Sequence, residues 1–210
     1  MRVYHFLSLQ NALSDIALCR IRVSRYHELN DPYELMAANV GPPAIRSAVK
    51  ANREGMEKEA GILCFTKEYK RPILWSHYAD KHRGVCLGFD LRDDVAVEVK
   101  YVRERVPLVS PDGKSAADDE TINSMLFSKD ADWNYEGEVR VHIQLRTVPI
   151  VEDGQYFLPL SSDLALQEVI LGARCPMPSE TVRKLVDRCH EGVAVRNAAL
   201  AFKWFSVVAD

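Results

Sequence analysis

Residues 133–140, WNYEGEVR, lead into the stretch that most clearly predicts a sheet, VRVHI at residues 139–143. Apolar side chains occupy every second position from Val139 to Ile143, which is typical of a strand with one face in a core. We take this strand as the centre of the predicted fold and work outward from it.

The residues between these apolar positions carry charge. In an extended chain Glu136, Glu138 and Arg140 are spaced by two, so all three project from one face. Burying charges without partners is costly. Two interpretations stay open: an exposed strand face with a cross-strand ion pair, or the wall of a polar cleft.

The remaining pattern predicts one α+β domain, residues 1–210, with a mixed or antiparallel sheet. A chain of 210 residues with 47% hydrophobic content is long enough for one sizeable core. We expect strands at residues 3–6, 21–23, 61–66, 84–89, 95–102, 139–143, 156–159, 166–172, 193–200 and 204–208. We expect helices at residues 9–18, 44–58, 73–81 and 119–128, a further helix capped by Ser179, and a surface loop at residues 103–119.

Several classes of protein are disfavoured. A formal charge of −3 gives no general reason to expect a nucleic-acid coat. Five scattered cysteines without CxxC predict reduced thiols rather than zinc or disulfides. GxxxxGK[ST], GxGxxG and GxSxG are absent from the sequence. The start lacks the apolar core of a signal peptide, and no apolar run approaches the roughly 20 residues of a spanning helix. We therefore expect a cytoplasmic protein with no membrane partner.

Four segments resemble a bacterial family known as domain of unknown function 2971. They are LNDPYE at residues 29–34, LCFTKEYKRPILWSHYADKHRGVCLGF at 63–89, DWNYEGEVRV at 132–141 and QEVILGARCPMPSETVRKLV at 167–186. The resemblance covers nearly the whole chain but implies no activity.

A second, more distant resemblance implies one. Residues 3–6, VYHF, followed by NALSDI at 11–16, resemble the opening of DarT-type DNA ADP-ribosyltransferases. The strand, proline and aromatic helix of residues 62–78 have a similar layout, as does a late strand led by Glu138 or Glu168. The resemblance implies a split sheet with NAD in its cleft. It also implies transfer of ADP-ribose to a nucleic acid or protein, in a toxin or a phage-defence effector.

This chemistry assigns candidate roles. ADP-ribosyl transfer passes through an oxocarbenium-like state that a carboxylate can stabilise. We expect Glu138 to be that carboxylate and Glu136 to assist it or bind the acceptor. Glu168 is the rival, at the start of a strong strand but without polar neighbours in sequence.

His5 would contact a ribose, Tyr78 would stack on a base or nicotinamide, and Arg140 would contact phosphate or ribose. A buried aromatic face is the simpler explanation for Trp75, and turn chemistry explains Asn30 and Asp31 equally well. The candidate NAD-binding residues are His5, Asn30, Asp31, Trp75, Ser76, His77, Tyr78 and Arg140.

Two other functions remain open. Asp31, Glu34, Glu136 and Glu138 could gather a divalent metal for a nuclease, although their spacing does not require one and we predict no metal site. A non-enzymatic module that binds a nucleotide or a phage protein is the third hypothesis.

Overall fold

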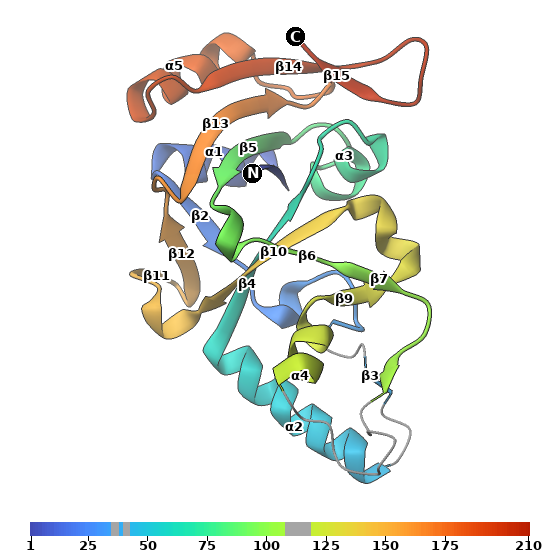
Figure 1. The fold of residues 1–210 in the computed structure, drawn as a ribbon. Helices are drawn as coiled ribbons and strands as arrows, with labels where there is room; N and C mark the ends of the chain where they lie inside the picture. The colour runs from blue at the N-terminus through green and yellow to red at the C-terminus, as the bar shows by residue number, and fades with distance from the viewer. Residues whose placement is uncertain (35–37, 40–42, 108–118) are drawn as a thin grey trace.

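The computed structural model describes residues 1–34, 38–39, 43–107 and 119–210. Within these residues, eight strands form the main sheet in the order β15-β14-β13-β5-β1-β4-β10-β6 (Figure 1). The β13–β14 pair is parallel and the other pairs are antiparallel. The α+β class with a mixed sheet is therefore confirmed. The strands are β1 (Arg2–Leu7), β4 (Ala60–Thr66), β5 (Val85–Leu91), β6 (Val97–Glu98), β10 (Glu138–Gln144), β13 (Leu164–Leu171), β14 (Ala194–Leu200) and β15 (Val207–Ala209).

Smaller sheets extend this framework. One joins β2 (Arg20–Val23), β11 (Ile150–Glu152) and β12 (Gln155–Pro159). Another pairs β7 (Lys100–Val102) with β9 (Ser128–Asp130), and a third pairs β3 (Ala38–Asn39) with β8 (Val106–Pro107). The β9 strand and the 3-10 helix after it deliver the polar residues of the site described below.

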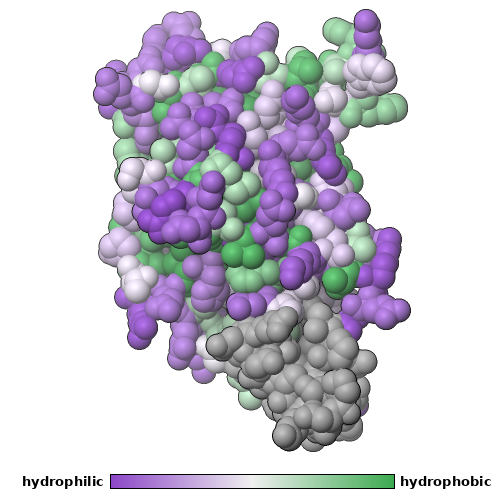
Figure 2. Space-filling model, in the orientation of Figure 1, coloured by the Kyte–Doolittle hydropathy of each residue, from purple (hydrophilic) through white to green (hydrophobic). Residues whose placement is uncertain are grey.

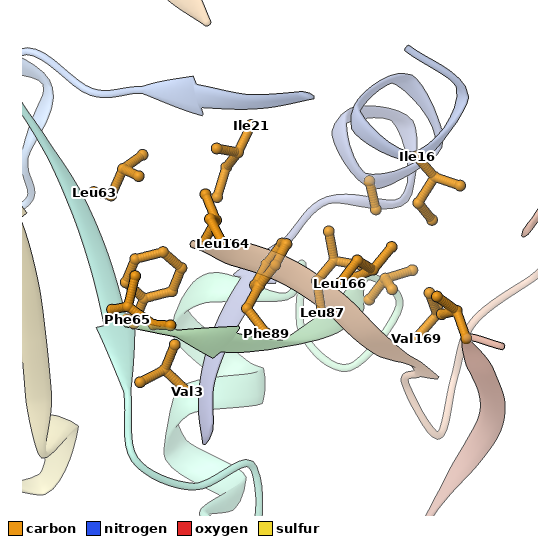
Figure 3. Close-up of a cluster of buried hydrophobic side chains, with 14 of the residues drawn as sticks. Val3, Ile16, Ile21, Leu63, Phe65, Leu87, Phe89, Leu164, Leu166 and Val169 are labelled. Atoms are coloured by element: carbon orange, nitrogen blue, oxygen red, sulfur yellow. The ribbon is translucent and has the colours of Figure 1, made fainter. Parts of the chain in front are cut away.

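Helices cover the sheet on both faces. α1 (Leu9–Ala17) and α5 (Ser179–Cys189) bury Ile16 and Val182 in the larger core, together with Val3 of β1 (Figure 3). α3 (Pro72–Tyr78) packs on the other face of the sheet. Side chains alternate along β1, so Phe6 points to the face opposite Val3, where it packs against α3. α2 (Pro43–Glu59) and α4 (Asp119–Leu126) complete the described helices. Within the described chain, none of these helices has the length and apolar character needed to cross a membrane.

Most predicted elements are present, but some boundaries are wrong. The strand predicted at residues 95–102 is broken into β6 and β7, and the helix predicted to reach residue 128 ends at Leu126. Of the last predicted strand, residues 204–205 form a bend, Ser206 has no regular structure, and β15 begins at Val207. Pro178 caps α5, so Ser179 is its first residue. Most of the loop predicted at 103–119 lies outside the described residues.

The strand predicted at residues 139–143 begins one residue earlier, at Glu138, but the extended chain assumed at Glu136 is wrong. Residues Ala131–Glu136 form a 3-10 helix, and Gly137 then takes a left-handed φ of +51°. Glycine adopts this conformation without a Cβ clash, so the chain turns sharply before β10 starts at Glu138. Glu136 and Glu138 therefore reach the same place from a helix and a strand.

The main sheet opens between its fifth and sixth strands, β1 and β4. β1 pairs with β5 along six residue pairs, from Arg2–Asp90 to Leu7–Val85. Within the fully described β1 and β4, the register is the single pair Tyr4–Thr66. The two strands diverge beyond that pair, and this divergence positions the candidate site.

Candidate functional site

A cavity of about 350 Å³ lies where β1 and β4 diverge. Its walls come from both strands, from α3, from the segment that follows β2, and from the residues around β9 and β10. The lining residues are Tyr4, His5, Phe6, Glu28, Leu29, Asn30, Glu34, Cys64, Phe65, Thr66, Leu74, His77, Tyr78, Lys129, Glu136 and Glu138. Residues far apart in sequence, including His5, Tyr78 and Glu138, thus share one hollow.

His5 bridges the gap between the two strands. Its Nδ1 lies 2.8 Å from the carbonyl oxygen of Cys64 in β4. Its ring also meets that of Phe65 edge-on, at a centroid distance of 5.7 Å. Burial lowers the pKa of His5 below its ordinary value, although the hydrogen bond to Cys64 opposes this effect. Because Nδ1 donates to this carbonyl, the Nε2 atom of the neutral ring is free to accept one hydrogen bond without adding charge.

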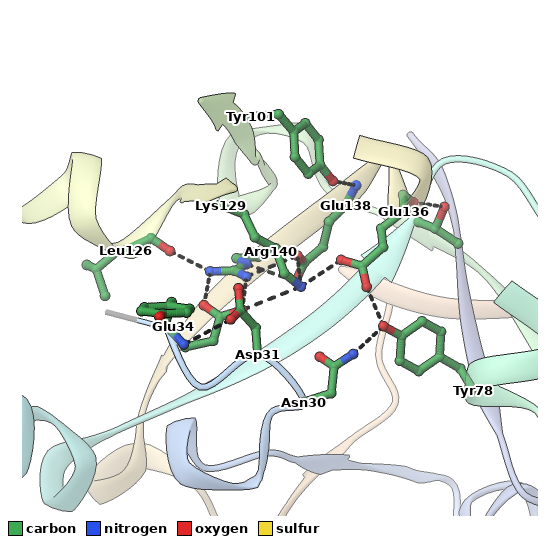
Figure 4. Close-up of polar contacts among 12 residues, drawn as sticks. Asn30, Asp31, Glu34, Tyr78, Tyr101, Leu126, Lys129, Glu136, Glu138 and Arg140 are labelled. Carbon is green, nitrogen blue, oxygen red and sulfur yellow. Dashed lines mark hydrogen bonds and ion pairs between the residues drawn. The ribbon is translucent and has the colours of Figure 1, made fainter. Parts of the chain in front are cut away.

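Glu136 is the carboxylate tied directly to α3. The Tyr78 hydroxyl donates to Glu136 Oε1, and the Asn30 side-chain amide donates to the same hydroxyl oxygen (Figure 4). Lys129 Nζ donates to Glu136 Oε2 at 2.7 Å. Burial raises the pKa of Glu136 above its ordinary value, against the opposing effect of Lys129. Burial and the adjacent Glu136 also raise the pKa of Tyr78, so the phenol stays protonated.

Glu138 is held by Arg140. The Arg140 Nε and Nη2 atoms donate to Glu138 at 2.8 and 3.0 Å, and Nη1 and Nη2 donate to Glu34 at 2.9 and 2.7 Å. Nη1 also donates to the carbonyl of Leu126 at 2.7 Å. Burial alone would raise the pKa of Glu138, but the charge and hydrogen bonds of Arg140 outweigh it and lower that pKa. Glu138 is therefore ionised at neutral pH.

Lys129 lies at the centre of the acids. Its Nζ is 3.5 Å from carboxylate oxygens of both Glu34 and Glu138, besides its shorter contact with Glu136. Burial opposes its charge, but the carboxylates prevail and raise the pKa of Lys129. Within the described part of the chain, this cluster contains three carboxylates (Glu34, Glu136 and Glu138) and two cations (Lys129 and Arg140). Its formal net charge is therefore −1. No group of His, Cys, Asp or Glu among the described residues is arranged to hold a metal ion.

Glu168, the other candidate carboxylate, lies elsewhere. It sits inside β13 rather than at the start of that strand, which begins at Leu164. It also has polar partners that its sequence neighbours do not reveal. Arg2 Nη1 and Arg196 Nη1 donate to it at 3.1 and 3.2 Å, and the Tyr4 hydroxyl donates at 3.1 Å. Glu168 thus reaches the cavity only through Tyr4, whose ring forms part of the wall.

The four candidates on α3 separate into two pairs. His77 and Tyr78 line the cavity. Trp75 is fully buried, meets Phe6 edge-on at 5.1 Å, and donates from Nε1 to the Tyr69 carbonyl at 2.6 Å. Ser76 is exposed and donates to the Pro72 carbonyl at 3.0 Å. Successive helical residues point in different directions, so one helix cannot bring all four to a single site.

The three remaining candidates also differ. Asn30 lines the cavity. Asp31 is buried and accepts a hydrogen bond from the Tyr33 backbone at 2.9 Å, which agrees with the turn explanation. It borders a neighbouring hollow that shares Lys129 with the cavity. Arg140 is completely buried behind Glu138, so it holds a carboxylate rather than an open phosphate site.

Lys129 is the residue that sequence reasoning missed. It stands four positions before Trp133, and its ammonium lies 4.5 Å from the centre of that ring. A lysine four residues from an aromatic is too common to identify a site. Tyr4, Cys64 and Thr66 were also missed as lining residues, because each reads as an ordinary strand position.

Comparison with known proteins supports one resemblance. No curated protein and no solved structure matches this chain significantly. A family model described as a protein of unknown function (DUF2971) matches residues 74–141. The matched segment begins in α3 and ends in β10, so it includes Tyr78, Lys129, Glu136, Glu138 and Arg140. The cavity-lining end of α3 and the acid cluster thus lie in a segment similar to DUF2971, a family whose description assigns no activity.

Proposed function

We propose that the cavity binds NAD and that the protein transfers ADP-ribose to a nucleic-acid or protein acceptor. One observation carries this proposal: His5, Tyr78 and the Glu136–Glu138 pair line a single cavity at the opening between β1 and β4. A cleft between diverging strands is the arrangement implied by the resemblance to ADP-ribosyltransferases.

The size and lining of the cavity suit the nicotinamide riboside half of NAD. A volume of about 350 Å³ lies at the lower end of the range for small-molecule sites. Phe65, Leu74 and Tyr78 supply apolar and aromatic surface for a flat ring. The Nε2 atom of the neutral His5 ring can accept a hydrogen bond from a ribose hydroxyl.

The two cavity glutamates then take different parts in the reaction. The glycosidic C–N bond breaks, and its electron pair leaves with nicotinamide, which departs as a neutral molecule. The acceptor's nucleophilic atom bonds to the ribose carbon and gives its proton to Glu136, whose raised pKa suits a base. Glu138 remains ionised and stabilises the positive charge that develops on the ribose. Arg140 acts by positioning Glu138.

The two alternatives have less support. A metal-dependent nuclease would use the acidic residues, but Glu34, Glu136 and Glu138 already contact Lys129 or Arg140, and these cations oppose a divalent ion. A non-enzymatic binding module would use the same cavity without turnover. The proposed toxin or phage-defence role rests on the family resemblance, and the proposed cytoplasmic location, where NAD is available, rests on the sequence pattern.

The test uses NAD labelled in its adenylate phosphate. The protein is incubated with DNA, RNA and protein acceptors, and both free nicotinamide and label on the acceptor are measured. We expect Glu136→Gln and His5→Ala to abolish transfer, whereas Glu180→Gln, on the exposed face of α5, leaves it unchanged. Calorimetry that finds NAD binding without turnover would favour the binding module. A folded protein that neither binds nor cleaves NAD contradicts the proposal.

A further inference from the structure

The loop between β14 and β15 presents an aromatic finger, defined here as residues 202–205, FKWF. Phe202 and Phe205 are 106% and 104% exposed, and Trp204 is 77% exposed. Figure 1 shows the loop projecting beyond the body of the molecule, and Figure 2 shows the same corner standing clear in the space-filling view. Solvent exposure of large aromatic rings on this scale is unfavourable unless another surface covers them.

The finger is firmly attached to the sheet. The Ala201 amide donates to the Ser206 carbonyl at 2.9 Å, which closes the loop. The Val207 amide donates to the Lys70 carbonyl at 2.8 Å, and the Val207 side chain is fully buried. The rings are therefore held away from the body by an ordered base, and their exposure shows that none of the described segments covers them.

The surroundings of the finger combine apolar surface with positive charge. Leu200 and Val208, at the base of the loop, are 54% and 45% exposed. Lys203 lies between the aromatic residues, and Lys70 lies beside the base. Among the described residues, neither lysine takes part in an ion pair. Aromatic rings that enter the boundary of a bilayer, with ammonium groups that meet lipid phosphates, are a recurrent combination in peripheral membrane proteins.

We propose that the aromatic finger docks the protein onto a bilayer that contains anionic phospholipid. The free lysines complement the negative charge of such a surface. Energetically important aromatics at protein interfaces lie in packed pockets, ringed by other contacts. Phe202 and Phe205 have no such ring of neighbours, and a soft lipid surface does not require one. Docking of this kind needs no spanning helix, and it replaces the expectation of no membrane partner that was drawn from the apolar runs.

Vesicle sedimentation tests the proposal. The full chain is mixed with vesicles of phosphatidylcholine alone or with 30% phosphatidylglycerol, at about 0.1 M salt. We expect binding to the anionic vesicles, at least tenfold weaker binding by Phe202→Ser/Phe205→Ser, and several-fold weaker binding by Lys203→Glu. Leu18→Ser, at another exposed apolar residue, serves as the matched control and should bind like the wild type.

Fluorescence identifies the bound segment. Binding should shift the emission of the wild type to the blue, and Trp204→Phe should keep binding while losing that shift, since the other tryptophans lie elsewhere. Absence of wild-type binding to anionic vesicles would overturn the proposal. Equal binding by the double serine variant would overturn it as well. Vesicle-free self-association that the double variant abolishes would identify a second copy of the chain as the occupant instead.

Discussion

Arg140 binds Glu138 through two hydrogen bonds, of 2.8 and 3.0 Å, although the two residues are neighbours on one face of a single strand. The same guanidinium binds Glu34, 106 positions away in sequence. Arg140 therefore links β10, which carries the proposed catalytic Glu138, to the segment after β2 that carries Glu34.

Removing this guanidinium should be costly. Arg140→Met leaves Glu34 and Glu138 buried with Lys129 as their remaining cation, and loss of one partner of a buried pair typically costs about 3–5 kcal/mol. Urea denaturation measures the free energy of unfolding. Arg83→Ala, which breaks an exposed pair with Asp80, is the matched control and should leave stability unchanged. A small effect of Arg140→Met would show that the cluster is hydrated and weakly coupled.

The proposed base predicts a pH dependence. The pKa of Glu136 is raised, so its ionised form is lost as the pH falls through a value above the ordinary 4.5. Nicotinamide release by the wild type should therefore decline on the acidic side at a pH above 4.5, and Glu136→Gln should abolish release at every pH. Glu138, with its lowered pKa, should not contribute to that limb. A rate that is flat down to pH 4.5 contradicts the assignment of Glu136 as base.

A separate carboxylate, Asp15 of α1, should respond to pH through stability. It is buried, Oδ2 has no hydrogen-bond partner among the described residues, and burial raises its pKa to about 7 despite the nearby Arg20. The folded state thus holds this proton more tightly than the unfolded state. Asp15 therefore lowers stability progressively as the pH rises from about 4 to about 7, and the penalty is complete above that window.

Asp15→Asn should remove that penalty. We expect the variant to gain up to about 4 kcal/mol at pH 8 relative to pH 4, because a pKa raised from 3.8 to about 7 corresponds to a penalty of roughly that size. Thermal unfolding of both proteins at the two pH values checks this difference. An equal effect at both values would mean that Asp15 does not titrate in that range.

Gly88 of β5 permits Glu168 to cross that strand toward Tyr4. A Cβ at this position would lie 2.6 Å from Glu168 Cγ and 3.2 Å from Tyr4 Cε1. Gly88→Ala should therefore cost about 1–3 kcal/mol through overpacking. Gly55→Ala is the matched control, since its new Cβ meets open space on α2, and it should gain about 0.5–1 kcal/mol from helix propensity. Equal stability of the two variants would contradict this account of the crossing.

Sequence patterns predicted the sheet well because its strands are apolar runs. Residues 61–66 and 84–89 were expected as buried strands, and β4 and β5 lie there. Strands as short as β9 and β11 have too few residues for alternation to be visible. The burial of these short strands depends on the strands they pair with, β7 and β12, which the sequence pattern does not identify.

The candidate site was predictable only in part. The spacing by two correctly placed Glu138 and Arg140 on one strand face, whereas the turn at Gly137 moved Glu136 into a helix. His5 and Tyr78 were singled out by residue type, and the structure brings them to one cavity. Lys129 was not predicted as a site residue, because its role depends on three glutamates that approach it from different segments of the chain.

The single Tyr4–Thr66 pair has a consequence for how the molecule responds to an occupant. Neighbouring strands are normally held together by backbone hydrogen bonds along several residue pairs, and β1 and β4 have one such pair. A ligand in the cavity that forms hydrogen bonds to both β1 and β4 would add interactions between the two strands. Ligand binding should therefore stabilise the sheet locally. Slower hydrogen exchange of the backbone amides of β1 and β4 would report that the cavity is occupied.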